Sequence, residues 1–321
     1  MTIPSSAAPS LIALDWGTTW LRAYLLGPEA QVMETRAEPL GVMQLRDGDF
    51  TAAFEQVTKS WRDNWRNLNT IASGMIGSTQ GWAETPYCRC PASINELAAA
   101  LTPVHDGTVH IVSGIAQYGD APNMMRGEEA QIVGALELHP ALAADSMLVM
   151  PGTHSKWVHV MNGAVVNFTT YVTGELFAVL RDHSVLGRAE RDAGSAPHRD
   201  SAEAAFARGV LAARSATLGI TPLLFSARAM VLAQRVEPEA SLEYLSGLLV
   251  GDEVRCGLAT HARPSALIGD ALLCARYVRA LEHFDVPALP VYHGTAAQGL
   301  WEIARRAGLL VAPPPLRAYD T

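Results

Sequence analysis

The sequence predicts an α/β protein with two related lobes, each built on a mixed sheet, around a central cleft. One pattern occurs twice, over residues 11–38 and 147–171: a strand, a Gly-Thr turn, a second strand, a hairpin turn and a third strand. Elsewhere, short apolar strands alternate with segments of helical periodicity, which is typical of α/β layers. We therefore expect a duplicated fold. Chance recurrence of a common pattern is the alternative.

The predicted strands are short apolar runs that end at Gly, Pro, Asn or Asp. In chain order they cover residues 11–14, 20–26, 31–38, 70–72, 109–112, 147–150, 156–161, 164–171, 266–268 and 290–293. The predicted helices repeat apolar residues every three or four positions, and they cover residues 50–65, 128–138, 201–218, 222–233, 241–260, 268–284 and 295–307. Trp61 and Trp65 show this spacing and predict a packed face. We expect an N-terminal lobe over residues 1–143 and a C-terminal lobe over residues 144–321.

The bulk composition limits the classes of function. The net charge of −8 makes nucleic acid and anionic membranes unfavourable partners. No run approaches the roughly 20 apolar residues of a membrane span, and residues 1–10 lack the features of a signal peptide. The four cysteines fit no disulfide framework. We therefore expect a cytoplasmic protein with small-molecule partners, and a homodimer stays open.

The first candidate site follows the first strand. Asp15 ends this strand, and Gly17, Thr18 and Thr19 form the turn after it. A glycine lets backbone N–H groups approach phosphate oxygens, and threonine hydroxyls add donors. An aspartate at a strand end can hold a hydrated Mg²⁺. The alternative is a plain hairpin turn with Asp15 in a favoured turn position.

The second candidate site repeats this element after the strand over residues 147–150. Gly152 and Thr153 form the turn, and His154 and Lys156 follow. Lys156 adds a positive charge that could pair with a phosphate. The alternative is a second plain hairpin. Two such turns together are a stronger indication of phosphate binding than either turn alone.

A third candidate site opens the helix predicted over residues 128–138. Arg126, Glu128 and Glu129 lie at its start. Phosphoryl transfer needs a positioned base for the attacking hydroxyl, and we favour Glu128 over Glu129 for this role. Simple capping of the helix dipole is the alternative. Arg126 has a planar fork suited to a substrate carboxylate, unless it forms an ion pair with one of these glutamates. Glu175 opens a later helix and is the next candidate base.

Seven motifs along nearly the whole chain carry a resemblance to one family. They lie at residues 15–19, 73–78, 125–129, 151–157, 170–177, 183–188 and 244–253. In this order they resemble the 2-dehydro-3-deoxygalactonokinase family. The resemblance implies the two-lobed actin-like ATPase (ribonuclease H-like) fold. It also implies MgATP-dependent phosphorylation of the terminal, 6-position hydroxyl of 2-dehydro-3-deoxy-D-galactonate in galactonate breakdown.

The resemblance also implies roles for particular residues. It assigns the ATP phosphates to the two Gly-Thr turns, Mg²⁺ to Asp15, and a catalytic base to Glu128 or Glu129, where distant sugar kinases carry an aspartate. Gly269 matches their adenosine loop, although that loop carries two glycines. The residues implied in binding the sugar acid are Ser73, Gly74, Met75, Arg126, Tyr171 and Thr173.

Other functions stay open. A kinase for another sugar acid or sugar would have the same motifs, because sugar epimers differ in one hydroxyl orientation. An ATPase switch of the same superfold would hydrolyse ATP without an acceptor. A non-catalytic sugar-sensing regulator would be expected to carry a DNA-binding segment, and no such segment is evident before Leu11. Acceptor-dependent release of ADP distinguishes a kinase from the other two.

Overall fold

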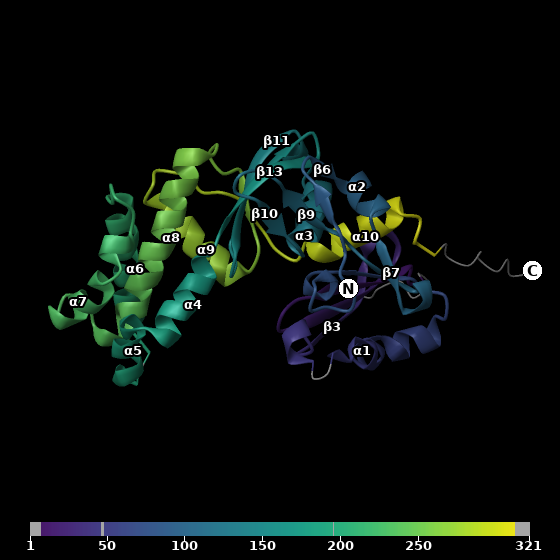
Figure 1. The fold of residues 1–321 in the computed structure, drawn as a ribbon, viewed down its shortest axis with the longest axis horizontal. Coiled ribbons are helices and arrows are strands. Elements are labelled where there is room, and N and C mark those ends of the chain that lie inside the picture. Colours follow the sequence, from purple (N-terminus) through teal and green to yellow (C-terminus); the bar gives the residue numbers. More distant parts are fainter. Residues whose placement is uncertain (1–7, 46–47, 195, 312–321) are drawn as a thin grey trace, which may run out of the picture. The chain divides into compact units, whose positions relative to one another are not determined.

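The computed structural model describes residues 8–311, except residues 46, 47 and 195. The described chain forms two compact units (Figure 1). The first unit contains residues 8–145, 160–167 and 294–311, and the second contains residues 146–159 and 168–293. Residues 294–311 therefore belong with the N-terminal unit, whereas we expected them in the C-terminal lobe.

The main sheet of the first unit has six strands in the described chain, in the order β3-β2-β1-β4-β8-β7. The strands are β1 (Leu11–Trp16), β2 (Leu21–Leu26), β3 (Val32–Glu38), β4 (Thr70–Ser73), β7 (Thr102–Val104) and β8 (Val109–Ile111). Strands β1, β2 and β3 form the expected antiparallel meander, and β4 and β8 continue the sheet parallel to β1. The carboxyl ends of β1 and β4 therefore meet at one edge of the sheet.

The sheet of the second unit repeats this order. Its strands run β15-β14-β11-β12-β13 and end in the short strand β6 (Ala92–Ser93) of the first unit. Strands β14 and β15 continue parallel to β11. The strand bounds are β11 (Asp145–Met150), β12 (Ser155–Met161), β13 (Ala164–Tyr171), β14 (Ala266–Ile268) and β15 (Val291–Tyr292). A meander followed by two parallel strands thus occurs in both units, which confirms the predicted duplication and the α/β class. The expected cleft stays a prediction.

Five further elements of the first unit are too short to show a period in the sequence. A small sheet has the order β10-β9-β5, and β6 pairs with the start of β13. The bounds are β5 (Tyr87–Arg89), β6 (Ala92–Ser93), β9 (Gly114–Gln117), β10 (Asn123–Met125) and the helix α2 (Ile94–Ala99).

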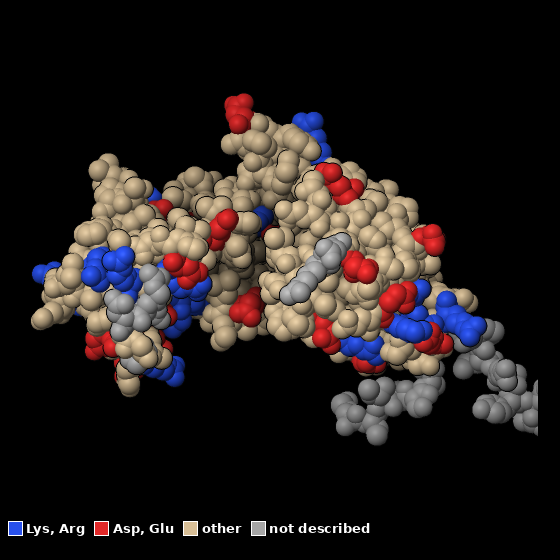
Figure 2. Space-filling model, turned by 60° about the horizontal axis from the view of Figure 1, so that its bottom comes forward, with Lys and Arg blue, Asp and Glu red and all other residues tan. Residues whose placement is uncertain are grey.

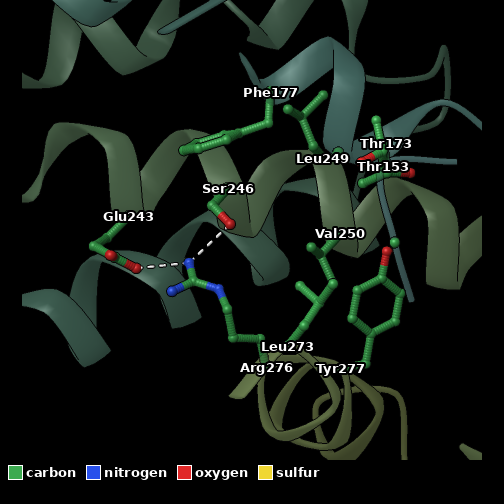
Figure 3. A pocket seen from close by; sticks show the side chains of 12 residues that line it. Thr153, Thr173, Phe177, Glu243, Ser246, Leu249, Val250, Leu273, Arg276 and Tyr277 are labelled. Atoms are coloured by element: carbon green, nitrogen blue, oxygen red, sulfur yellow. Dashed lines mark hydrogen bonds and ion pairs between the residues drawn. The ribbon is translucent and has the colours of Figure 1, made fainter. Parts of the chain in front are cut away.

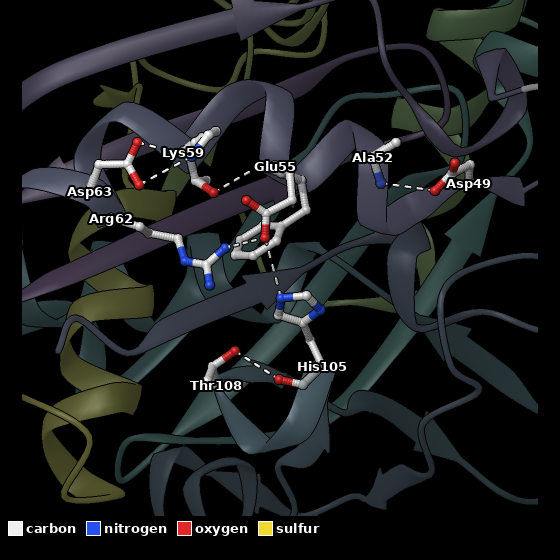
Figure 4. Close-up of polar contacts among 10 residues, drawn as sticks. Asp49, Ala52, Glu55, Lys59, Arg62, Asp63, His105 and Thr108 are labelled. Carbon is white, nitrogen blue, oxygen red and sulfur yellow. Dashed lines mark hydrogen bonds and ion pairs between the residues drawn. The ribbon is translucent and has the colours of Figure 1, made fainter. Parts of the chain in front are cut away.

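Helix α1 (Phe50–Asn64) begins at a capping aspartate and packs one face on the main sheet of the first unit. The side chain of Asp49 accepts a hydrogen bond from the backbone N–H of Ala52 at 2.8 Å (Figure 4). On the exposed side, Glu55 forms an ion pair with Arg62 at 2.5 Å, and Nε2 of His105 lies 3.4 Å from the same carboxylate oxygen. The buried face contains Phe50, Ala53, Phe54, Val57, Thr58 and Trp61. The predicted packing is confirmed for Trp61 and wrong for Trp65, which follows the last residue of the helix and is exposed.

The second unit is mainly helical beyond β13. Its helices are α4 (Thr173–His183), α5 (Arg188–Ala193), α6 (Arg199–Arg214), α7 (Ser226–Leu232), α8 (Ser241–Thr260) and α9 (Ala271–Glu282). Helices α6 and α8 pack closely through glycines: a Cβ on Gly209 would lie 2.2 Å from the carbonyl oxygen of Tyr244. Among the described residues, no helix is long and apolar enough to cross a membrane. On the face shown in Figure 2, acidic and basic side chains are intermingled.

Helices α3 (Glu128–Leu138) and α10 (Ala296–Arg306) of the first unit also approach each other at glycines. A Cβ on Gly299 would lie 1.8 Å from the carbonyl oxygen of Ala130, and a Cβ on Gly134 would lie 1.9 Å from that of Thr295. The hydroxyl of Thr295 donates to the carbonyl of Gln131 at 2.9 Å. Helix α10 therefore fixes the position of α3, which carries the candidate base at its start.

We expect Gly299→Ala to destabilise the protein, because the new methyl group has no space between α10 and α3. Overpacking of this kind typically lowers the free energy of unfolding by about 1–3 kcal/mol. Thermal unfolding measures this loss, with Gly119→Ala as the control, since a Cβ on exposed Gly119 meets no atom within 4 Å. Equal melting temperatures for the two variants would contradict the close approach of these helices.

Candidate active site

The first Gly-Thr turn (residues 16–19) joins β1 to β2 and is braced by the backbone of residues 41–43. Gly41 N–H donates to the carbonyl of Thr19, and Met43 N–H donates to that of Thr18, both at 3.0 Å. Thr18 and Thr19 are exposed. Gly17 has no left-handed φ, and a Cβ on it would meet its nearest atom at 3.6 Å. The fold itself therefore leaves room for a side chain at this glycine.

Asp15 lies at the carboxyl end of β1, next to Ser73 at the end of β4. Its side chain is 21% exposed and pairs with Arg22 at 3.6 Å. Burial raises the pKa of Asp15, Arg22 opposes this shift, and the negative charge of Glu128 adds to it. Asp15 is therefore held near a second carboxylate at the edge of the sheet.

The chain after β4 turns sharply at Gly74. Its φ of 98° lies in the left-handed region, and a Cβ on it would lie 2.6 Å from the carbonyl oxygen of Trp16. Ser73 is fully buried, and its hydroxyl has no hydrogen-bond partner among the described residues. Met75 packs against the apolar core of the first unit. Of the three sugar-site candidates in this stretch, Ser73 and Gly74 lie beside Asp15.

The start of α3 approaches this turn. Gly127 precedes the helix with a φ of 109°, and a Cβ on it would lie 3.2 Å from the Cα of Gly74. The carboxylates fold back onto the backbone before the helix: Glu128 accepts from Arg126 N–H at 3.0 Å, and Glu129 accepts from Gly127 N–H at 2.6 Å. The structure thus brings Glu128 and Glu129 into the same unit and the same sheet edge as Asp15.

Glu128 and Glu129 differ in their surroundings. Glu128 is partly exposed, whereas Glu129 is fully buried. Burial, followed by repulsion from Glu128, raises the pKa of Glu129 to about 8. Its Oε1 atom has no hydrogen-bond partner among the described residues. Glu128 is therefore the more accessible of the two carboxylates, while Glu129 holds the loop before the helix.

The guanidinium of Arg126 contacts Tyr87 and Thr85, and its expected contact with a substrate carboxylate stays a prediction. It lies over the ring of Tyr87, 4.3 Å from the centroid, and donates to the hydroxyl and, at 3.0 Å, to the carbonyl of Thr85. Its Nε atom is buried without a hydrogen-bond partner in the described chain. Thr85 rather than a glutamate therefore holds this side chain by hydrogen bonds.

The second Gly-Thr turn (residues 151–155) packs against the start of α4. The backbone N–H of Glu175 donates to the carbonyl of Thr153 at 3.0 Å. A Cβ on Gly174 would lie 2.5 Å from the carbonyl oxygen of Gly152. Gly152 itself has no left-handed φ, and a Cβ on it would meet its nearest atoms at 3.9 Å. Like Gly17, Gly152 has room for a side chain.

Two candidate phosphate-binding residues near this turn, His154 and Lys156, contact neighbouring residues. The ring of His154 is exposed and its Nε2 lies 2.6 Å from a carboxylate oxygen of Glu175. Lys156 is 3% exposed, and its Nζ donates to the carbonyl of His154 at 2.7 Å. Lys156 thus supports the turn from within, and its expected contact with a phosphate stays a prediction.

A cavity of about 410 Å³ opens beside the second Gly-Thr turn in the second unit (Figure 3). The turn residues Gly152 and Thr153 line one side together with residues of α4, and residues of α8 and α9 line the rest. Arg276 of α9 donates to Glu243 at 2.7 Å and to Ser246 at 2.8 Å across this wall. A largely apolar cavity with a few fixed polar groups is typical of a ligand site.

Some of the predicted site residues line this cavity, and others do not. Thr173, expected at the sugar acid, lines the cavity together with Gly152 and Thr153. Tyr171 packs on Trp157 with ring centroids 6.5 Å apart and is not among the described cavity residues. Gly269 is also outside this lining. The cavity residues of α8 and α9 escaped prediction because their helical spacing is also that of a packed face.

Asp15 in the first unit fits an Mg²⁺ ion that binds together with the phosphates of a nucleotide. Among the described residues, no group of three or more His, Cys, Asp or Glu side chains could hold an ion. Mg²⁺ is commonly bound by one or two carboxylates together with substrate phosphates. Asp15, partly exposed at the strand end, suits that arrangement.

Comparisons with known proteins agree over nearly the whole chain. Residues 15–303 match the model of the family described as 2-keto-3-deoxy-galactonokinase. The 2-dehydro-3-deoxygalactonokinase of Escherichia coli (strain K12) is 36% identical over 91% of this chain and 97% of the relative. A probable 2-dehydro-3-deoxygalactonokinase of Rhizobium meliloti (strain 1021) is 34% identical over 84% and 88% of the two chains.

Two solved structures are similar to this chain over nearly its whole length. A crystal structure of a candidate 2-dehydro-3-deoxygalactonokinase from Sinorhizobium meliloti has a TM-score of 0.82 and 32% identity, and the match covers 92% of this chain and 98% of that one. Component A of the (R)-2-hydroxyglutaryl-CoA dehydratase of Acidaminococcus fermentans has a TM-score of 0.51 and 14% identity, over 94% and 100% of the two chains. The second likeness concerns the fold alone.

The raised pKa of Glu129 predicts a pH-dependent stability. The folded protein holds this proton up to about pH 8, whereas the usual pKa is 4.5. The resulting stabilisation is complete below the lower value and is lost as the pH rises through the higher one. Relative to Glu129→Gln, the wild type should lose about 1.4 kcal/mol of unfolding free energy per pH unit between these values.

Urea unfolding of both proteins at pH 6, 7 and 8 measures this difference. Glu29→Gln is the control, because Glu29 is an exposed glutamate of the same unit. Parallel pH dependence of the wild type and Glu129→Gln would contradict a buried, protonated Glu129.

Proposed function

Because the chain belongs to the 2-keto-3-deoxy-galactonokinase family, we propose that it transfers the γ-phosphoryl group of ATP to the 6-hydroxyl of 2-dehydro-3-deoxy-D-galactonate. The products are ADP and the 6-phosphorylated sugar acid. The family match over residues 15–303 carries this proposal, since it spans both Gly-Thr turns and the start of α3. The resemblance expected from the seven motifs is thereby confirmed.

The first unit supplies the reacting groups. Glu128 accepts the proton of the attacking hydroxyl, because it is the partly exposed glutamate at the start of α3 and lies near Asp15. Asp15 would hold the Mg²⁺ of MgATP, which would offset negative charge on the phosphates. Ser73 and Gly74 contact the sugar acid beside them. The unpaired Nε of Arg126 supports a contact with the substrate carboxylate.

The two Gly-Thr turns bind the phosphates of ATP. Backbone N–H groups and the hydroxyls of Thr18 and Thr153 supply donors, and both hydroxyls are on exposed residues. The supporting observation is the free space at Gly17 and Gly152. A glycine that neither backbone conformation nor packing requires is explained by the close approach of a ligand. The nucleoside occupies the cavity beside Thr153 and Tyr277.

An ADP-release assay tests the function. The purified protein is incubated with MgATP and, in separate reactions, a series of 2-keto-3-deoxy sugar acids and neutral sugars. We expect ADP release that depends on the acceptor and is fastest with 2-dehydro-3-deoxy-D-galactonate. ADP release at the same rate without any acceptor would indicate an ATPase switch instead.

We expect Gly152→Ala to weaken ATP binding without weakening the fold. The added methyl group has room in the protein but occupies the approach to the backbone of the turn. The KM for ATP should rise about tenfold, which corresponds to about 1.4 kcal/mol, while the KM for the sugar acid and the melting temperature stay unchanged. Gly119→Ala is the control. An unchanged KM for ATP would argue against phosphate contact at this turn.

We expect Glu128→Gln to lower kcat with little change in the KM for the sugar acid. General base catalysis typically contributes about 10²- to 10⁴-fold, and the amide cannot accept the proton. Glu129→Gln is the matched variant and should lose less activity, because Glu129 is fully buried. A general base should account for a loss of at least about a hundredfold. If both variants keep at least about a tenth of wild-type kcat at saturating ATP, the loss is too small for a base, and the base lies elsewhere.

A further inference from the structure

A buried carboxylate of the second unit gathers hydrogen bonds from elements around the second Gly-Thr turn. Glu253 of α8 is 2% exposed. Its Oε1 accepts from the indole N–H of Trp157 at 3.0 Å. Its Oε2 accepts from the hydroxyl of Tyr277 at 2.6 Å and from the hydroxyl of Thr173. Strand β12 and helices α4, α8 and α9 thus meet at one side chain.

The Tyr277 branch continues to the turn itself. The hydroxyls of Tyr277 and Ser155 lie 2.8 Å apart, and the backbone N–H of Gly152 donates to the Ser155 hydroxyl at 3.3 Å. Ser155 is fully buried. The contact between its hydroxyl and the carbonyl of Gly152, at 3.5 Å, is longer than a normal O–H···O bond. A hydrogen-bonded path therefore leads from Glu253 to Gly152.

The donors along this path follow from the contacts of Glu253. Burial raises the pKa of this carboxyl, and the three side chains that donate to it oppose the shift. Tyr277 donates to Glu253, so its oxygen accepts from Ser155. Ser155 in turn accepts from Gly152 N–H. Burial and then the charge of Glu253 raise the pKa of Tyr277 well above its usual value, so that the phenol keeps its proton.

The Thr173 branch reaches the same turn from the other side. Thr173 opens α4, whose next residue, Gly174, packs against Gly152 and Thr153. The backbone N–H of Glu175 then binds the carbonyl of Thr153 at 3.0 Å. Both branches of Glu253 therefore end on the two residues of the turn that line the cavity, and Thr173 and Tyr277 line it as well.

We propose that Glu253 is a positioning residue for ATP binding, which sets the backbone of Gly152 and Thr153 through Tyr277, Ser155 and Thr173. Its carboxylate draws the N–H of Gly152 inward and leaves the outer side of the turn to the phosphates. This role rests on the proposed function of the turn. Glu253 itself is buried and touches no ligand.

Direct binding of a non-hydrolysable ATP analogue, measured by calorimetry without sugar acid, tests this role. Ser155→Ala and Tyr277→Phe each break the path, and each should weaken the Kd about five- to tenfold, the effect of about one buried hydrogen bond. The double variant should be no weaker than either single variant, because both lie on one path. Glu253→Gln should lose at least as much affinity, and the KM for the sugar acid should stay unchanged.

A second buried tyrosine provides the matched control. Tyr244 is 2% exposed, and its hydroxyl lies 2.8 Å from that of Ser226, away from the turn. Tyr244→Phe should cost similar stability and leave the Kd of the analogue unchanged. Wild-type affinity of Ser155→Ala, or equal weakening by Tyr244→Phe, would overturn the proposal. Because the assay measures nucleotide binding alone, a wild type that binds the analogue but phosphorylates no sugar acid would contradict the proposed function instead.

Discussion

The arrangement of the first unit depends on how closely the start of α3 approaches the edge of the main sheet. Gly74 turns with its Cα against the backbone of Trp16, and Gly127 fits over Gly74 in turn, so that neither position has room for a Cβ without displacement. This contact brings the glutamates of α3 to the end of β1. The same closeness repeats at the other face of α3, where Gly299 of α10 meets Ala130. Packing at glycines thus brings these carboxylates to one edge of the sheet.

Electrostatics then separates the roles of these carboxylates. Three of them, Asp15, Glu128 and Glu129, lie near one sheet edge, and each ionised neighbour makes the next ionisation less favourable. Glu129 takes the buried position and keeps its proton to about pH 8. Asp15 is offset by Arg22, and Glu128 stays accessible. In the second unit the buried carboxylate of Glu253 accepts hydrogen bonds from three side chains, and it positions the second Gly-Thr turn instead of reacting.

The sequence predicted features that depend on local pattern. Both meanders, the start of α3 and the family follow from apolar runs, Gly-Thr turns and motif order, and the structure and comparisons confirm them. Strands β6 and β9 carry too few residues for a period, whereas the equally short β14 stands out as an apolar run between Pro264 and Gly269. The cavity wall of Glu243 and Arg276, the engagement of Arg126 by Thr85 and the placement of α10 with α3 arise from contacts between residues far apart in the chain.

The central claim is that Asp15 and Glu128 serve one reacting centre. A double-mutant cycle on kcat, with Asp15→Asn, Glu128→Gln and the combined variant, tests it most directly. When two residues act together in one step, replacing both costs less activation free energy than the sum of the two single replacements. The account predicts that the combined variant is barely slower than the slower single variant. If the fold-loss in kcat of the combined variant equals the product of the two single fold-losses, the two residues act independently, which would contradict a shared centre.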